Sequence, residues 1–161
     1  MLRCKVSSDH EDLSVLSVTH PWIPNSETIR PTQDDIERKN ATLVEIHEQW
    51  FSLKDYIQSA VFHLEHSVIA GRSVVMTTPG RGLRRVFQPN AFPYNTPEGN
   101  HWVMWYSKQS CPYGDDIITE DIESALSEHL GNDTNFDFVW YENPKMSVPD
   151  FYHVQVFWTK L

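Results

Sequence analysis

The amino-acid sequence predicts an α+β domain, in which an antiparallel sheet of about five strands carries two N-terminal helices and one inserted helix packed on one face. Two patterns lead to this class. Apolar residues recur at helical spacing across residues 32–68 and again across 119–130. Stretches of aromatic and β-branched character, typical of strands, occupy residues 73–88, 101–107, 135–142 and 151–160. Helices and strands segregated in this way indicate an antiparallel sheet covered by helices.

The chain divides into an irregular N-terminal arm, residues 1–31, and a single α+β domain, residues 32–161. A length of 161 residues suits one domain. Prolines interrupt the arm, since proline lacks a backbone donor and restricts the residue before it. We expect Trp22 and Ile23 to anchor the arm on the domain.

The first predicted helix begins at Thr32, whose hydroxyl can cap the backbone, with Asp34 and Asp35 in its first turn. His47 falls on the apolar face of this helix, so we expect it to face the core.

The second predicted helix begins at Ser52, with Asp55 in a position typical of a capping box. Gly71 ends this helical region. Residues 73–88 are then predicted to form a β-hairpin whose turn contains Pro79-Gly80.

The third predicted helix begins at Thr119 and ends at Gly131. It separates the strand over 101–107 from the two strands that finish the chain.

Alternation along two strands places histidines on faces that can line a pocket. His101 shares its face with Trp105, and His153 shares its face with Gln155, whereas the opposite face of the last strand is purely apolar and aromatic. If the two strands expose matching faces, the histidines approach each other. Because histidine is the commonest acid/base group, we assign His101 this role, with His153 assisting and Trp105 forming a wall. The alternative is that each histidine bonds a loop backbone.

The loop before the first of these strands, within residues 87–100, is stiffened by prolines. Asn90 and Tyr94 lie in it, and we expect them to orient a substrate. Arg84 and Arg85 end the preceding strand, and their planar guanidinium groups suit a carboxylate or phosphate. The alternative is a solvated hairpin with charged tips.

The formal net charge of −9 argues against general nucleic-acid binding, which depends on neutralising phosphates. No apolar run approaches the roughly 20 residues of a membrane helix, and the start of the chain lacks the apolar segment of a signal peptide. We therefore expect a soluble, cytoplasmic protein with no membrane partner. Two cysteines, Cys4 and Cys111, make no disulfide framework.

Standard signatures of cofactor and metal sites are absent from the sequence, so we expect no cofactor and no metal. His63 and His66 have a spacing that can hold a metal, but we favour surface histidines. Asp115 and Asp116 belong to an acidic cluster whose carboxylates can bind a hard cation, but we favour the alternative that they complement a helix dipole. The sequence leaves the roles of both pairs open.

Two stretches of the chain carry a recognisable pattern, which in chain order reads Pro89-Asn90-x-Phe92-Pro93-Tyr94, His101-x-Val103-x-Trp105-x-Ser107-Lys108, Trp140-Tyr141-x-Asn143-Pro144, Ser147-Val148-Pro149 and His153-Val154. Together they resemble the fungal N-acetylglucosamine-induced protein family, a domain of unknown function, over about residues 36–158. The family's name reports induction, so the resemblance implies no sugar substrate.

Related fungal proteins are expected to include the arginine-containing cyclodipeptide synthases, which join amino acids carried on tRNA. An acidic doublet followed by a glutamate, with two positions between them, is expected there. This sequence has Asp115-Asp116 with Glu120, one position too long, and Asp34-Asp35 with Glu37, one position too short.

Three functions follow from these observations. The first is an enzyme that acts on a small polar or anionic substrate in a pocket lined by the proline-stiffened loop and the two histidine-bearing strands. The second is a non-catalytic binding module or a subunit of a larger assembly. The third, implied by the resemblance, is aminoacyl-tRNA-dependent amide or cyclodipeptide formation. The sequence does not decide whether the chain is an enzyme, and it leaves the substrate, the reaction and the oligomeric state open.

Overall fold

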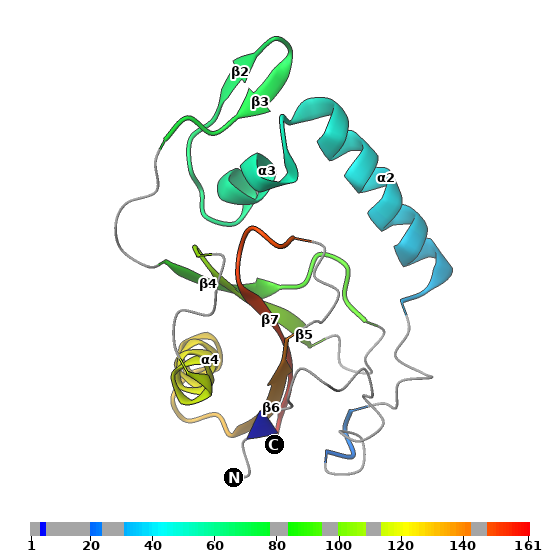
Figure 1. Ribbon diagram of the computed structural model, residues 1–161. Helices are drawn as coiled ribbons and strands as arrows, with labels where there is room; N and C mark the ends of the chain where they lie inside the picture. Colours follow the sequence, from blue (N-terminus) through cyan, green and yellow to red (C-terminus); the bar gives the residue numbers. More distant parts are fainter. Residues whose placement is uncertain are drawn as a thin grey trace.

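The computed structural model describes residues 4–5, 20–23, 31–77, 84–94, 100–108, 114–142 and 148–161. Within these ranges the chain forms three helices, a five-stranded sheet and a two-stranded sheet (Figure 1). The predicted α+β class is confirmed.

The five-stranded sheet has the order β1-β6-β7-β5-β4. Its strands are β1 (Cys4–Lys5), β4 (Arg85–Pro89), β5 (His101–Tyr106), β6 (Phe136–Tyr141) and β7 (His153–Lys160). The short β1 runs parallel to β6, and all other neighbours are antiparallel. The long strand β7 therefore lies at the centre, hydrogen-bonded to β5 on one side and β6 on the other.

The register between β5 and β7 fixes which side chains share a face. Met104 pairs with Val154, and Val103 pairs with Gln155. Because successive residues of a strand point to opposite faces, Met104 and Val154 belong to one face and Val103 and Gln155 to the other.

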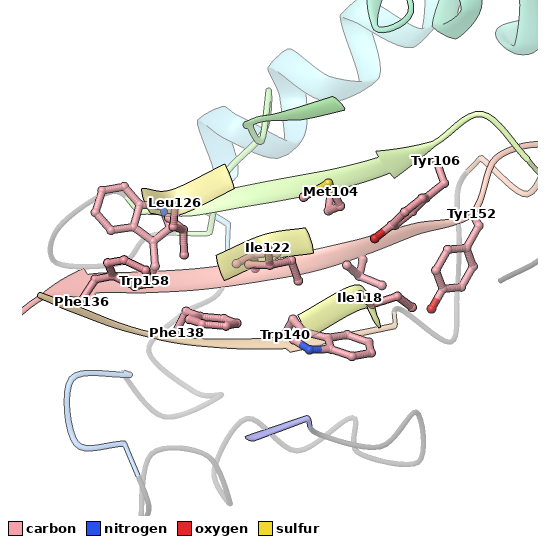
Figure 2. Close-up of a cluster of buried hydrophobic side chains, with 12 residues drawn as sticks. Met104, Tyr106, Ile118, Ile122, Leu126, Phe136, Phe138, Trp140, Tyr152 and Trp158 are labelled. Atoms are coloured by element: carbon pink, nitrogen blue, oxygen red, sulfur yellow. The ribbon is translucent and has the colours of Figure 1, made fainter. Parts of the chain in front are cut away.

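One face of the sheet is covered by helix α4 (Asp115–Leu130). Ile118, Ile122 and Leu126 of this helix are fully buried, because they recur at helical spacing and meet the apolar side chains of β5, β6 and β7. Figure 2 shows them packed over Met104 and Trp140. This layer forms the largest cluster of buried side chains that the structure describes.

The opposite face is covered by helix α3 (Leu53–Ala60), which follows α2 (Gln33–Gln49). Ile57 of α3, with Val61 just beyond its end, packs on Val103 and Trp105. The expectation that all three helices pack on one face therefore needs correction: α4 and the α2–α3 pair lie on opposite faces. β5 and β7 are buried on both faces, and each presents apolar or aromatic side chains to both layers.

Local capping signals set the starts of the two N-terminal helices as predicted. Thr32 is the N-cap of α2, and its hydroxyl oxygen accepts a hydrogen bond from the Asp35 amide at 3.1 Å. Ser52 caps α3 in the same way through the Asp55 amide at 3.1 Å. His47 is exposed, so the expectation that it faces the core is wrong: α2 touches the body along a narrow stripe. No described helix is both long enough and apolar enough to cross a membrane.

The predicted hairpin over residues 73–88 does not form. Strand β3 (Arg72–Val74) instead pairs with β2 (Ser67–Ile69), while β4 pairs with β5. Ala70 and Gly71, with φ of +50° and +78°, make the tight turn between β2 and β3. A turn with two positive φ values favours glycine and asparagine, so alanine gave no signal for it. Pro79-Gly80 lies outside the described residues.

Helix α4 begins one turn earlier than predicted, with Gly114 as N-cap. Thr119 lies inside the helix, where its hydroxyl donates to the Asp115 carbonyl and accepts from the Trp140 indole, each at 2.9 Å. The predicted end is confirmed, since Gly131 closes the helix with a φ of +89°.

Two described residues of the N-terminal arm anchor it on the sheet, as expected. Ile23 is buried beside Val139 and Phe157, and the indole Nε1 of Trp22 donates to Asp137 at 3.0 Å. The strand β1 was not expected in an arm predicted to be irregular.

Candidate functional site

A cavity of about 440 Å³ lies between the α2–α3 pair and the sheet face that carries both histidines. This volume falls within the roughly 300–1,000 Å³ typical of small-molecule sites. Five of the seven predicted site residues line it: His101, His153, Asn90, Tyr94 and Trp105. Arg84 and Arg85 do not.

His101 is held on both sides of its ring. The backbone amide of Tyr94 donates to its Nδ1 at 2.9 Å, and its Nε2 lies 2.7 Å from Oε1 of Gln155. Since a backbone N–H can only donate, Nδ1 is unprotonated and the neutral ring carries its hydrogen on Nε2, which donates to Gln155. The ring also stacks on Phe157, with centroids 4.4 Å apart. His101 therefore fits the alternative interpretation, in which the histidine forms a hydrogen bond with a loop backbone.

Burial lowers the pKa of His101 to about 4, because the charged imidazolium loses its hydration, and the bond to Gln155 opposes this only in part. Protonation of His101 would also place a hydrogen on Nδ1, directly opposite the Tyr94 N–H that now donates to it. His101 is thus a neutral group near neutral pH, and its two nitrogens have no capacity left for a ligand.

The loop of residues 90–94 is held in place by hydrogen bonds to His101 and Gln155. Asn90 donates from Nδ2 to Oε1 of Gln155 at 3.0 Å and accepts at Oδ1 from the Phe92 amide at 2.8 Å. The backbone amide of Asn90 also donates to the His101 carbonyl at 2.9 Å. These bonds hold residues 90–94 against the sheet, with the Tyr94 ring 4.9 Å from that of His101. Asn90 and Tyr94 shape the cavity wall, and the side-chain oxygen and one amide hydrogen of Asn90 are already bonded.

The Tyr94 side chain reaches Tyr141 on β6. Burial raises the pKa of the Tyr141 hydroxyl, and the hydrogen-bonded Tyr94 hydroxyl adds to this rise. The Tyr141 phenol is therefore not set up as an anion.

His153 is arranged differently. Its Nδ1 lies 2.9 Å from the Phe151 carbonyl, an acceptor, so Nδ1 carries the hydrogen and Nε2 carries the lone pair. Its ring stacks on Trp105, with centroids 4.4 Å apart and planes 26° from parallel. Nε2 has no hydrogen-bond partner among the residues that the structure describes, and His153 lines the cavity. Burial lowers the pKa of His153, partly offset by the bond to Phe151, which keeps this lone pair available.

The two histidines do not approach each other. His101 pairs with Phe157, and His153 pairs with Trp105, so the histidines lie four residues apart along the strands. At the rise of an extended strand this separates their backbones by about 13 Å. Gln155 lies between them. The sequence predicted the shared face, but the distance depends on a register that it does not reveal.

Arg85 lies on the other side of the sheet. Since β4 alternates, Val86 and Gln88 face the α3 layer while Arg85 and Phe87 face α4. Arg85 forms an ion pair with the buried carboxylate of Asp121 and borders an open groove of about 520 Å³.

Arg84 is exposed. Its backbone amide donates to the Ser107 hydroxyl at 2.8 Å, which ties the start of β4 to the end of β5. The structure therefore does not bring the predicted anion-binding arginines to the histidines.

Two other cations line the cavity, Arg38 and Lys39 of α2. The Arg38 guanidinium lies 5.4 Å from the centre of the Phe92 ring and pairs with Asp35 at 3.0 Å. Lys39 has no polar partner in the described part of the chain. Sequence reasoning missed both residues, because a helix pattern shows which face is polar but not which loop that face meets.

The Asp115-Asp116 doublet and the His63 and His66 pair do not line this cavity. Asp115 and Asp116 occupy the first turn of α4, as the dipole argument expects. His66 contacts the Ser59 hydroxyl at 3.2 Å. Among the described residues no group of three or more His, Cys, Asp or Glu side chains could hold a metal ion. The side chains of Cys4 and Cys111 lie outside the described residues.

Comparisons of this chain with known protein families, with curated proteins and with solved structures found no match.

Proposed function

We propose that this chain binds a small organic anion with an apolar body in the cavity between α2–α3 and the sheet, and that His153 transfers a proton to or from it. One observation supports the anion: Arg38 and Lys39 line the cavity, and no Asp or Glu does so in the described part of the chain. The whole chain has 22 acidic residues against 13 Lys and Arg, so a lining without carboxylates runs against its composition.

The two cations differ in how they are neutralised. Arg38 shares its charge with Asp35 on the same helix. Lys39 is half-buried and has no such partner among the described residues, so its charge acts on whatever enters the cavity. A negative ligand group gains most from this position, because partial burial weakens screening by water.

The remaining walls support an apolar body. Leu43, Ile46 and Ile57 of the helices line the cavity together with Val103 and Trp105 of the sheet. Burying a ligand's hydrocarbon part there is favourable at roughly 25 cal/mol per Å² of apolar surface. A carboxylic acid with an aromatic or aliphatic body combines both requirements.

His153 supports the proton transfer. Its Nε2 lone pair belongs to a neutral ring, oriented by the Phe151 carbonyl and the Trp105 stack. A neutral imidazole is a competent general base, whereas His101 has both nitrogens bonded. This assigns His153 the acid/base role and gives His101 the role of positioning the loop.

The test of anion binding uses three ligands of one shape: phenylacetate, phenylacetamide and phenethylamine. Isothermal titration calorimetry should show phenylacetate binding about tenfold more tightly than the amide, because a charge-assisted hydrogen bond contributes roughly 1.5–3 kcal/mol. The amine should bind most weakly. Equal affinities for the acid and the amide would contradict the proposal.

A matched pair of double variants tests the residues. R38Q/K39Q should lose the preference for the acid. K54Q/R72Q removes the same net charge from exposed positions on α3 and β3 and should keep it. If both double variants lose the preference equally, the effect comes from overall charge and the cavity assignment is wrong.

A non-catalytic binding module is the second candidate. No serine or cysteine lines the cavity within the described residues, and the Thr42 hydroxyl donates to the Arg38 carbonyl at 2.9 Å. The described lining therefore offers no serine or cysteine nucleophile for covalent catalysis, and the proposed proton transfer depends on His153. A His153→Gln variant that binds phenylacetate unchanged is expected under both candidates. Only the enzyme predicts that the wild type exchanges an acidic ligand hydrogen with solvent deuterium faster than this variant does.

A further inference from the structure

We propose that the natural ligand has two polar ends, an anionic group held by Lys39 and Arg38 and a hydrogen-bond donor such as a hydroxyl held by His153, joined by an apolar chain of about ten bonds. This inference rests on the proposed function and names its ligand class: amphipathic acids with a terminal hydroxyl.

The cations lie at the His101 end of the cavity. Arg38 packs on Phe92, and Phe92 lies between the two loop residues that contact His101, Asn90 and Tyr94. Lys39 follows Arg38 on α2 and lines the same cavity. The anion-binding end is thus located above the start of β5.

His153 defines the other end. It pairs with Trp105, four residues beyond His101 along β5, which places the two ends about 13 Å apart. Helix α2 gives an independent measure of the length of the cavity. Lys39 and Ile46 both line the cavity, and seven residues of helix span about 10 Å. Figure 1 shows α2 rising from the side of the sheet toward α3.

Between the ends the lining is mostly apolar. Val103 lies on the sheet side, and Leu43 and Ile57 lie on the helix side. Gln155 and Gln88 are the polar exceptions on the sheet, and the amide oxygen of Gln155 already accepts from Asn90 and His101. The middle of the cavity therefore suits methylene groups.

The chemistry of the His153 end selects a donor. With Nδ1 committed to the Phe151 carbonyl, the ring presents an acceptor at Nε2. A hydroxyl can donate to it, whereas a second carboxylate would place a lone pair against a lone pair. The ligand is therefore asymmetric, with an anion at one end and a donor at the other.

The length follows from these distances. A fully extended chain advances about 1.2 Å per bond, which is the residue rise divided over three bonds. Spanning roughly 10–13 Å takes about eight to eleven bonds, the length of a decanoate chain.

The experiment measures binding of butanoate, hexanoate, decanoate and dodecanoate, each with and without a hydroxyl on its terminal carbon. We expect the hydroxyl to tighten binding about fivefold to tenfold at the decanoate length, the equivalent of one hydrogen bond of about 1 kcal/mol. At the butanoate length it should weaken binding, because the hydroxyl then lies in the apolar middle.

His153→Phe should abolish the gain from the hydroxyl while leaving plain decanoate bound, and His129→Phe, in the groove on the opposite face, should keep the gain. The chain-length series uses the wild type alone, so it still tests the proposal if the His153 variant misfolds. No hydroxyl effect at any length, with decanoate still preferred over decanamide, would overturn this inference and leave the proposed function standing. Loss of the preference for decanoate over decanamide would overturn both.

Discussion

Replacing His101 by phenylalanine tests the loop clamp and the neutral state of this ring together. Phenylalanine keeps an aromatic ring against Phe157 but removes both hydrogen bonds. The Tyr94 amide loses its acceptor, and Gln155 keeps only the Asn90 donor on its oxygen. An unsatisfied buried donor costs roughly 1–3 kcal/mol, so we expect a loss of about 2 kcal/mol in the free energy of unfolding at neutral pH.

The pH dependence gives the sharper result. The pKa of His101 falls from 6.5 in the unfolded chain to about 4 in the fold. Between these values the unfolded chain binds a proton that the folded chain does not, so the contribution of His101 to stability is present above pH 6.5 and is lost as the pH falls toward about 4. At roughly 1.4 kcal/mol per unit, this loss reaches about 3 kcal/mol. His101 is almost fully buried, so solvent screening does not reduce it substantially.

The variant lacks this titration. Urea unfolding of both proteins at several pH values between 7 and 4 should therefore show a higher free energy of unfolding for the wild type at pH 7. This difference in free energy should shrink and then reverse sign as the pH falls toward about 4. Other titrating groups, including His153, are present in both proteins and cancel in the difference. A difference that stays constant over this range would contradict the lowered pKa of His101, because His101 would then titrate alike in the folded and unfolded chains.

Three further predictions follow from the same structure. Arg85→Gln should lower the free energy of unfolding in urea by about 2 kcal/mol, because it leaves the buried Asp121 carboxylate without its ion pair. Its affinity for phenylacetate should stay unchanged, and a tenfold loss of affinity would show that Arg85 contributes to the binding site. Ser52→Ala removes the N-cap of α3 and should cost about 1 kcal/mol in the same assay, and no measurable cost would contradict the capping role. Long-range proton–nitrogen spectra at neutral pH should show His101 with its hydrogen on Nε2 and His153 with its hydrogen on Nδ1, and the same tautomer for both rings would contradict the hydrogen-bond assignment.

Much of the fold was predictable because its signals are local. Thr32 and Ser52 cap helices through their own hydroxyls, and Gly131 ends a helix at a positive φ. Alternation likewise predicted that His101 and His153 face away from the apolar side of the last strand. Such features depend on a few neighbouring residues, which the sequence displays directly.

The parts that were missed depend on contacts between distant segments. The partner of β4 is β5 and not β3, and strand pairing is decided by packing of the whole sheet. Arg85 could not be assigned to a face until the register of β4 was known. Lys39 reaches the cavity only because α2 crosses the loop at Phe92, an approach with no local signature.

We propose that an anionic ligand occupies the cavity between α2–α3 and the sheet. A titration of nitrogen-labelled protein with phenylacetate, followed by proton–nitrogen correlation spectra, tests it most directly. We expect the largest shifts at the amides of Lys39, Thr42 and Tyr94, with smaller shifts at His153. Shifts concentrated at Ser124 and His129, in the groove on the opposite face, or no saturable shifts at all, would contradict it.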